Sequence, residues 1–165
     1  MYPIIILMSI RERHAANMGY RKWWEFRKRD VTELTKADAV MLYETAPFSQ
    51  VGSVCVFDVA LSGPADKVWE LTRAGQGLTR EAYDEYYQGH DTAYAAGLGC
   101  YYSVWGDSHK MRFEPTLKDI RQAYAKDHPH AHRLWMPPQS WMRLPDGAVR
   151  DLMIETIETM TDFPL

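Results

Sequence analysis

The sequence predicts an α+β fold in which about six short strands form a small β-barrel or a curled sheet, with helices inserted between them. Two patterns carry this prediction: apolar or alternating segments typical of strands recur along the chain, and amphipathic segments typical of helices separate them. The third observation is size, because 165 residues with 46% hydrophobic and 25% charged side chains suit one domain with a sizeable core. We therefore expect a single domain over 1–165, with a core of about 3–144 and a C-terminal helix of about 148–160.

The predicted strands are runs of apolar or alternating residues that end at glycine, proline or charged residues. Ile4–Ser9, for example, is apolar and β-branched, and Pro3 and Arg11 bound it. The full set is Ile4–Ser9, part of Met18–Arg29, Ala39–Tyr43, Gly52–Leu61, Leu98–Trp105, Met111–Glu114 and Gln139–Leu144. The polar stretch Asp30–Asp38 is predicted to be a loop.

The predicted helices are marked by residues typical of helix ends. Thr79 is a good N-cap for Arg80–Gln88, which Gly89 ends, and Thr116 with Asp119 resembles a capping pair before Leu117–Ala125. Further helices are predicted at His14–Tyr20, after Pro64 with Val68, Trp69 and Leu71 on the apolar side, and at Ala148–Met160. The last helix places one apolar set on a single side: Val149, Leu152, Met153, Ile157 and Met160.

Charge is distributed unevenly along the chain. The net charge of -3 excludes a polycation that would coat nucleic acid through bulk charge, yet seven Lys and Arg residues lie between Arg11 and Arg29. Such a local patch indicates an anion site, and a solvated cationic face is the alternative. Cys55 and Cys100 form no C-x-x-C pair and are expected to be reduced core residues in a cytoplasmic protein.

The apolar run Tyr2–Ile10 is predicted to be a buried first strand. It is too short to span a bilayer, and it lacks the flanking features of a signal peptide. We therefore expect no membrane association.

The stretch Met18–Arg29 combines two tryptophans, a phenylalanine, one carboxylate and five cations. In a strand, side chains alternate between the two faces. Trp24 and Phe26 then share a face that is predicted to lie in the core. The other face carries Trp23, Glu25, Arg27 and Arg29, and this composition is typical of a binding surface.

Four pieces of the chain occur in an order that resembles the ASCH domain, a branch of the PUA-like superfamily. They are Leu7-Met-Ser-Ile-Arg11, then Lys22-Trp-Trp-Glu-Phe-Arg27 with its Lys-x-x-Glu-x-Arg pattern, then Tyr43-Glu-Thr-Ala-Pro47 closely followed by Gly52, and finally Pro137-Pro-Gln-Ser-Trp141. The resemblance covers the chain to about Leu144. It implies a PUA-like small β-barrel with flanking helices and a cleft, and RNA or modified-nucleoside chemistry.

The sequence departs from the family pattern at several positions. Gly19 lies one residue earlier than the usual spacing before Lys22. One bacterial branch of the family is an amidohydrolase of acetylated cytidine, and its pattern has threonines where this chain has Trp23 and Glu25. The downstream glutamate of that branch is absent from Arg73-Ala-Gly-Gln-Gly77, so only Lys22 matches.

Lys22, Glu25 and Arg27 are the residues most suited to chemistry. Glu25 and Arg27 share a strand face and could pair, so that the carboxylate stays ionised and accepts from the N–H edge of a base. Arg27 could instead bind a phosphate through two parallel hydrogen bonds. Lys22, if desolvated, could act as a base. The alternative is a surface ion pair worth about 0–1 kcal/mol.

Several further residues are candidates for contact with a nucleic acid. A base stacked on Trp23 would contribute about 1–3 kcal/mol, although this tryptophan could instead cover a helix. Arg11 extends the cationic patch and could hold backbone phosphates. Thr45, Gln139 and Ser140 offer hydroxyl or amide groups, and turn capping or strand initiation are their alternatives.

No metal or cofactor is predicted. His128-Pro-His-Ala-His132 places three imidazoles at alternate positions, but no C-x-x-C motif or helical histidine pair accompanies them, and Pro129 suggests a loop.

Three functions remain open from the sequence. The first is an ASCH-type domain that binds RNA, single-stranded nucleic acid or a modified nucleotide in a basic and aromatic cleft. The second is a hydrolase, either a ribonuclease or a modified-nucleoside amidohydrolase, with Lys22 and Glu25 as catalytic residues. The third is a protein-interaction module that uses helix Ala148–Met160, whose apolar side could instead close the barrel.

Overall fold

The computed structural model describes residues 3–11, 24–73, 75, 77–103, 114–131, 134–160, 163 and 165, and it leaves the side chains of 100–103 undescribed. These residues form one six-stranded sheet in the order β2-β5-β4-β3-β1-β6. The strands are β1 (Ile5–Ile10), β2 (Trp24–Arg27), β3 (Ala39–Glu44), β4 (Gln50–Pro64), β5 (Thr92–Ser103) and β6 (Trp141–Arg143). The helices are the 3-10 helix η1 (Thr32–Lys36) and the α-helices α2 (Ala65–Leu71), α3 (Arg80–Tyr87), α4 (Leu117–Asp127) and α5 (Ala148–Glu158).

Strands β1 and β3 lie side by side in parallel, with Ile5 opposite Ala39 and Ile10 opposite Glu44. The other strand pairs of the described sheet are antiparallel. Because parallel strands end at the same edge of a sheet, the carboxyl ends of β1 and β3 meet. This edge gathers most of the polar residues that the sequence singles out.

The alternation of side chains along β1 and β3 supplies two separate cores. One set, which includes Ile5, Leu7 and Met41, packs against α4 and α5. The other set, which includes Ile6 and Met8, lies on the opposite face, inside the curl of the sheet. Both faces of a strand that is buried on two sides are apolar, so a continuous apolar run such as β1 fits a central position.

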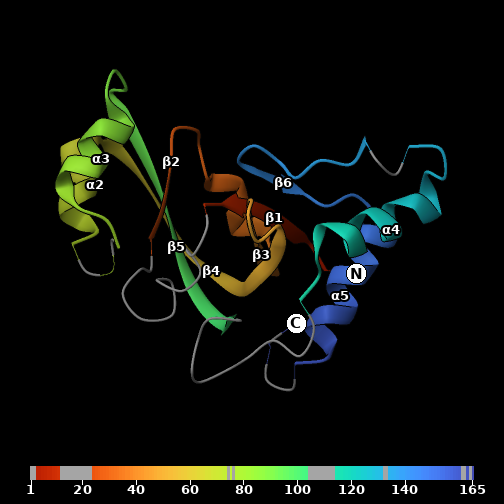
Figure 1. Ribbon diagram of the computed structural model, residues 1–165. Coiled ribbons are helices and arrows are strands. Elements are labelled where there is room, and N and C mark those ends of the chain that lie inside the picture. Colours follow the sequence, from red (N-terminus) through yellow and green to blue (C-terminus); the bar gives the residue numbers. More distant parts are fainter. Residues whose placement is uncertain are drawn as a thin grey trace.

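A third core lies between the other end of the sheet and helices α2 and α3. Phe26 on β2 packs edge-on against Tyr83, with ring centroids 5.1 Å apart, and Trp69 packs on the same tyrosine. Figure 1 shows α2 and α3 on one side of the molecule and α4 and α5 on the other, with the sheet between them.

The described strands do not close into a barrel. β2 and β6 are the two edges of the sheet, and no backbone pairing joins them in the described part of the chain. Side chains bridge the edges instead. Arg27 on β2 donates to the Ser9 carbonyl on β1, and Arg29 lies over the ring of Trp141 on β6. The expected α+β class and curled sheet are therefore present, and the closed barrel is not.

Strand β5 begins at Thr92, earlier than the expected start at Leu98. The missed part, Ala93–Gly97, is rich in alanine and glycine, which have low strand propensity. Its strand conformation comes from pairing with β2 on one side and β4 on the other. Small side chains are needed here, because a Cβ on Gly97 would lie 2.9 Å from a Val59 methyl group.

The stretch Asp30–Asp38 is not a plain loop. It contains η1, and Val31 and Leu34 are buried in the core inside the curl. Leu71, which was expected on the apolar side of α2, is instead 58% exposed near the end of that helix. The remaining helices follow the expected end signals, and Thr116 and Asp119 form the full capping box of α4.

The C-terminal helix begins at Ala148 as expected and ends at Glu158. Val149, Met153, Ile157 and Met160 are all buried in the core against the sheet. The apolar side of α5 is thus used within the chain itself.

Some expectations lie outside the described residues, namely helix His14–Tyr20 and most of strand Met111–Glu114. Cys55 is buried, and its backbone stands opposite Cys100 in the β4–β5 register. Within the described part of the chain, no helix has both the length and the apolar character required to span a membrane.

Candidate functional site

The carboxyl ends of β1 and β3 and the start of β6 meet at one edge of the sheet. Thr45, just after β3, donates its backbone N–H to the Ile10 carbonyl at 3.0 Å. β6 runs antiparallel to β1, so its first residues lie at the same edge, and Ser9 N donates to the Ser140 carbonyl at 2.9 Å. We call this region the strand-end site, comprising Ser9–Arg11, Glu25, Arg27, Glu44, Thr45 and Gln139–Trp141.

Glu25 and Arg27 form an ion pair within this site. Arg27 Nη1 lies 2.7 Å from Glu25 Oε1, and the two side chains are 13% and 3% exposed. Arg27 Nη2 also donates to the Ser9 carbonyl at 2.8 Å. The period of two along β2 predicts this shared face, but the face is turned into the curl of the sheet, where Glu25 stands opposite the buried Ala96.

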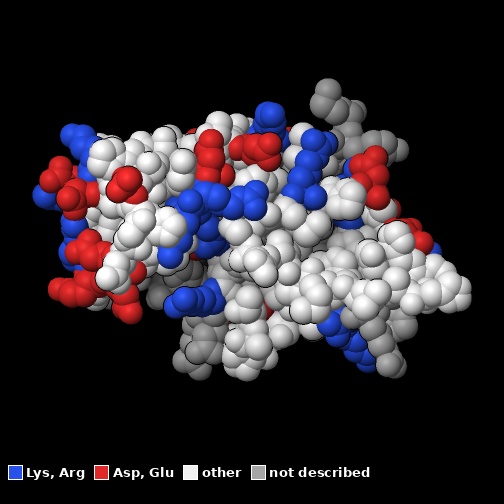
Figure 2. Space-filling model, turned by 90° about the horizontal axis from the view of Figure 1, so that it is seen from above, with Lys and Arg blue, Asp and Glu red and all other residues white. Residues whose placement is uncertain are grey.

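A row of cations continues from the ion pair along the exposed turn after β2. The Lys28 ammonium lies 4.8 Å from the centre of the Tyr86 ring, and the Arg29 guanidinium lies 4.2 Å from the centre of the Trp141 ring. Contacts of this kind stabilise the position of a cation by about 0.5–1 kcal/mol at exposed sites. Figure 2, seen from above Figure 1, shows Lys and Arg side chains gathered in the middle of this face.

Tyr86 on α3 lies beside the ion pair as well. Burial raises the pKa of the Tyr86 hydroxyl, while the positive charges of Arg27 and Arg11 act in the opposite direction. The exposed Arg11, at the end of β1, therefore contributes to the same positive field as Arg27. We call Arg11, Arg27, Lys28 and Arg29 the cationic row.

Polar residues at the end of β1 and just before β6 lie beside Arg27, which donates to the Ser9 carbonyl. Ser9 is in register with Tyr43 on β3 and bonds through its backbone to Ser140 on the other side. Among the described residues, the hydroxyls of Ser9 and Ser140, together with Trp141 Nε1 and Arg27 Nε, are buried and have no hydrogen-bond partner. Buried polar atoms are normally paired, so this edge can take up further hydrogen bonds.

Tyr43 is almost fully buried in the core that α4 and α5 cover, and its ring packs edge-on against Trp135, with ring centroids 6.5 Å apart. Burial raises the pKa of the Tyr43 hydroxyl, whereas a hydrogen bond with Ser49 and the charge of Arg121 lower it. The hydroxyl is therefore neutral at physiological pH and can both donate and accept.

Glu44 and Ser53 add buried polar groups to the interior of the sheet, and both have zero exposure. The Glu44 carboxylate lies against Gly52, where a Cβ would come within 2.7 Å of Oε1. A carboxylate at the end of an otherwise apolar strand is the sequence signal that could have identified Glu44.

The structure brings together most of the residues that the sequence singles out. Arg11, Glu25, Arg27, Thr45 and Ser140 all belong to the strand-end site, and the exposed Gln139 precedes Ser140. Lys22 and Trp23 lie outside the described residues, so their placement stays a prediction. Sequence reasoning placed Arg29 on the same strand face as Glu25 and Arg27. It did not assign Ser9, Lys28 or Tyr86 to the site, because their proximity depends on the curl of the sheet.

No metal centre is found in the described part of the chain, where no group of three or more His, Cys, Asp or Glu residues could hold an ion. His128 and His130 are exposed beyond the end of α4, and His132 lies outside the described residues.

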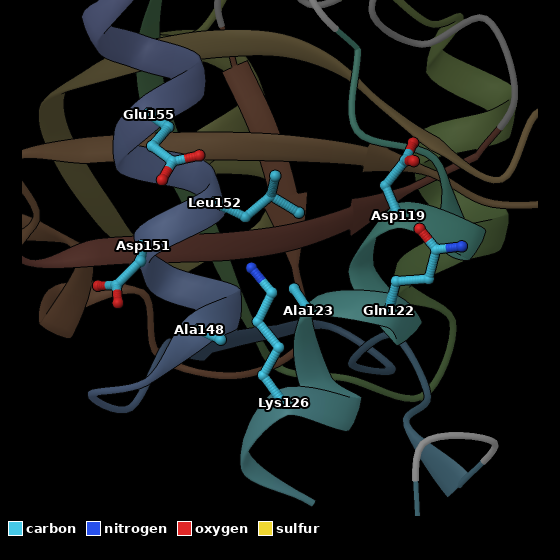
Figure 3. Close-up of a pocket in the computed structure, with 8 residues that line it drawn as sticks. All are labelled: Asp119, Gln122, Ala123, Lys126, Ala148, Asp151, Leu152 and Glu155. Atoms are coloured by element: carbon cyan, nitrogen blue, oxygen red, sulfur yellow. The ribbon is translucent and has the colours of Figure 1, made fainter. Parts of the chain in front are cut away.

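A separate hollow of about 320 Å³ lies between α4 and α5. Figure 3 shows its floor of small or apolar residues and the acidic side chains of Asp119, Asp151 and Glu155 around it, with Lys126 extending between the helices. Its negative character disfavours nucleic acid, and it lies on the face of the sheet away from the interior of the curl.

Solved structures with the same fold are ASCH proteins. An ASCH protein from Zymomonas mobilis matches with a TM-score of 0.68 and 20% identity over 96% of both chains. A serine-to-alanine mutant of the Zymomonas mobilis protein matches with a TM-score of 0.71 and 20% identity, over 92% of this chain and 95% of that one. A tyrosine-to-phenylalanine mutant matches with a TM-score of 0.70 and 20% identity, over 91% and 96%.

No protein-family model matches the chain, and no curated protein matches it in sequence. The resemblance to ASCH domains that the four sequence pieces predict is confirmed at the level of the fold.

Proposed function

We propose that this chain, with its ASCH fold, binds single-stranded RNA or a modified nucleotide at the strand-end site. The observation that carries the proposal is the cationic row, which lies beside buried hydroxyls that lack partners among the described residues. RNA supplies the complement of both features, because its phosphates are anionic and its bases and 2′-hydroxyls donate and accept hydrogen bonds.

Phosphates would bind the exposed members of the cationic row. Lys28 and Arg29 are exposed and held over aromatic rings, and Arg11 is exposed at the end of β1. Arg27 is mostly buried, and its guanidinium is oriented by Glu25 and by the Ser9 carbonyl. In this proposal Glu25 acts mainly by fixing Arg27, because only 3% of its side chain is exposed.

The base would meet the polar groups near the start of β6. Ser140 and Thr45 are half-buried and Gln139 is exposed, so each presents a group that can form a hydrogen bond at the edge of the site. Trp23 and Lys22 stay in the proposal as sequence-based expectations, with Trp23 as the stacking platform and Lys22 as a further cation.

Fluorescence anisotropy with a short labelled single-stranded RNA tests this function. Affinity should fall as salt rises, with a slope of about 0.7 per neutralised phosphate. A Lys28→Gln/Arg29→Gln variant removes two cations from the row, so its slope should be lower by about 1.4. Lys118→Gln/Lys126→Gln on α4 removes two exposed cations elsewhere and should bind like the unmodified protein. Absence of binding to any RNA at low salt would contradict the proposal.

A hydrolase that uses the same site is the second candidate. It is favoured by a buried carboxylate next to a guanidinium and to the Tyr86 hydroxyl, whose pKa burial raises, an arrangement typical of catalytic sites. Incubation with RNA and with N-acylated cytidine should then yield products, and Glu25→Gln should abolish them.

Two of the solved relatives carry a serine-to-alanine or a tyrosine-to-phenylalanine replacement. Ser140→Ala at the strand-end site, and Tyr43→Phe at the residue paired with Ser9 in the β1–β3 register, are the same types of change in this chain. If the variants Glu25→Gln, Ser140→Ala and Tyr43→Phe all turn over substrate as fast as the original protein, the proposal of a hydrolase at this site is wrong.

A further inference from the structure

A second hollow, outside the strand-end site, opens where β2 begins beside β5. Its volume is about 420 Å³, within the range of small-molecule sites. Trp24, Phe57 and Asp58 are among the residues that line it, and Gly97 and Gly99 contribute backbone. Trp24 is the neighbour of Glu25 in the chain but points to the opposite face of β2.

We call this second hollow the slot. Gly97 and Gly99 are two residues apart on β5 and therefore lie on the same face, where neither presents a side chain. The indole of Trp24 closes over Gly97, because a Cβ there would lie 3.3 Å from Trp24 Cζ3. Val59 and the indole thus cover Gly97, and the aromatic ring gives the slot a planar wall that suits a flat group.

Asp58 supplies the polar group of the slot. The β4–β5 register places Phe57 opposite Leu98 and Val59 opposite Gly97, so Asp58 is the extra residue of a β-bulge. Bulges turn a side chain away from the regular alternation of the strand. Asp58 is exposed, and its ionised carboxylate accepts hydrogen bonds without donating any.

We propose that this slot binds the base of a guanine nucleoside, stacked on Trp24 with its N1–H and N2–H donating to Asp58. Guanine is planar and carries two adjacent donors on its pairing edge, matching the two carboxylate oxygens. Adenine and cytosine each carry an acceptor next to the amino group and would place it against Asp58. No described residue that lines the slot is cationic, so the base rather than a phosphate is recognised.

The inference that the slot is a subsite for one base of an RNA rests on the proposed function. The slot itself can be tested with free guanosine, which carries no phosphate and does not use the cationic row. Isothermal titration of the full chain should show guanosine binding with one site. Inosine, which lacks the N2 amine, should bind about tenfold more weakly, because one hydrogen bond to a charged group is lost. Adenosine and 1-methylguanosine should bind more weakly still.

Two variants and one control test whether Asp58 and Trp24 bind guanosine. Asp58→Asn should weaken guanosine binding at least tenfold, because the amide presents only one acceptor and adds donors that oppose those of the base. Trp24→Phe should weaken it several-fold by reducing the stacked area. Asp91→Asn removes an exposed carboxylate just before β5 and should leave binding unchanged. Thermal unfolding midpoints of the three variants identify any that fail to fold, and Asp58→Asn, at an exposed position, is expected to fold.

Guanosine that fails to saturate the protein at millimolar concentration would overturn the inference, as would equal binding by Asp58→Asn. Failure of the proposed function gives a different result. If guanosine binds but RNA does not, the result supports the guanine site and contradicts the proposed RNA binding. RNA could also bind equally well to Asp58→Asn and to the original protein, with the same affinity when inosine replaces guanosine in the RNA. This result would contradict the guanine site and support the proposed RNA binding.

Discussion

The Arg27 guanidinium donates to the backbone carbonyl of Ser9 at 2.8 Å and thereby joins the first strand of the sheet order to the fifth. The same guanidinium holds the Glu25 carboxylate at 2.7 Å. A side chain thus performs part of the role that backbone pairing has in a closed barrel, and it fixes a positive charge at the strand-end site.

Replacing Arg27 should destabilise the fold. Arg27→Met leaves the Glu25 carboxylate buried beside an apolar side chain, and removing one partner of a buried ion pair costs about 3–5 kcal/mol. Urea unfolding followed by circular dichroism measures the loss. In Glu25→Gln/Arg27→Met, the destabilisation should be smaller than the sum of the two single changes, because the variants remove the same interaction. Strict additivity would show that the pair is energetically independent.

Gly52→Ala should destabilise the interior of the curl. The new Cβ would lie 2.7 Å from Glu44 Oε1 and 3.0 Å from Glu44 Cδ, and this glutamate has no exposed surface into which it could move freely. Overpacking of this kind costs about 1–3 kcal/mol. Ser53→Ala, at the next buried position, is the matched control and should change the free energy of unfolding much less. A Gly52→Ala protein as stable as the original would show that Glu44 has room to reorient.

Alkaline pH should destabilise the core between β2 and α3. Burial raises the pKa of Tyr83 to about 12, from its usual value of 10.0. A group whose pKa is raised in the folded state contributes stability that is fully present below the unfolded pKa and is lost as pH rises through the folded pKa. The free energy of unfolding should therefore fall by about 2–3 kcal/mol between pH 10 and pH 12 from this residue.

Urea unfolding at pH 9 and at pH 11.5 measures this effect. Tyr83→Phe also removes the hydrogen bond from the hydroxyl to the Ala65 carbonyl, so it should lower stability at pH 9. Its stability should nevertheless depend less on pH than that of the original protein. An unchanged pH dependence in Tyr83→Phe would exclude this tyrosine as the source.

Removing α5 should unfold the domain rather than expose a docking surface. Met153 and Ile157 are 0% and 1% exposed in the core that α5 and α4 build against the sheet. Deletion of 148–165 uncovers this core, and circular dichroism should show loss of the cooperative thermal transition. Truncation after Met160 keeps the helix and should keep the transition. A deleted chain that still melts cooperatively and has an unchanged mass by light scattering would assign α5 a role outside the core.

The sequence correctly predicted those features that depend on residues close together in the chain. Thr79 accepts from Ala82 N at the start of α3, and Thr116 and Asp119 form the capping box of α4, both as predicted. These bonds span three residues, so their formation depends little on the rest of the fold. The shared face of Glu25 and Arg27 belongs to the same category, because it follows from the period of a strand.

The features that the sequence did not predict depend on contacts between segments that are far apart in the chain. Ala93–Gly97 has weak intrinsic strand propensity, and it becomes part of β5 because β2 and β4 pair with it on both sides. Val31 and Leu34 stand in a polar stretch, and the curl of the sheet provides the apolar surface that η1 covers. Closure of the barrel was expected from the family resemblance, whereas among the described strands the two edges meet only through side chains.

The sequence by itself determined the two faces of β2, the caps of the helices and the concentration of cations before residue 30, because each depends on residues close together in the chain. Tertiary structure decided that the Glu25–Arg27 face turns inward and that Arg27 reaches Ser9, eighteen residues away. It also brought Arg29 to Trp141. These contacts depend on the parallel pairing of β1 with β3 and on the curl of the sheet, which are set by the packing of three cores and by no single segment.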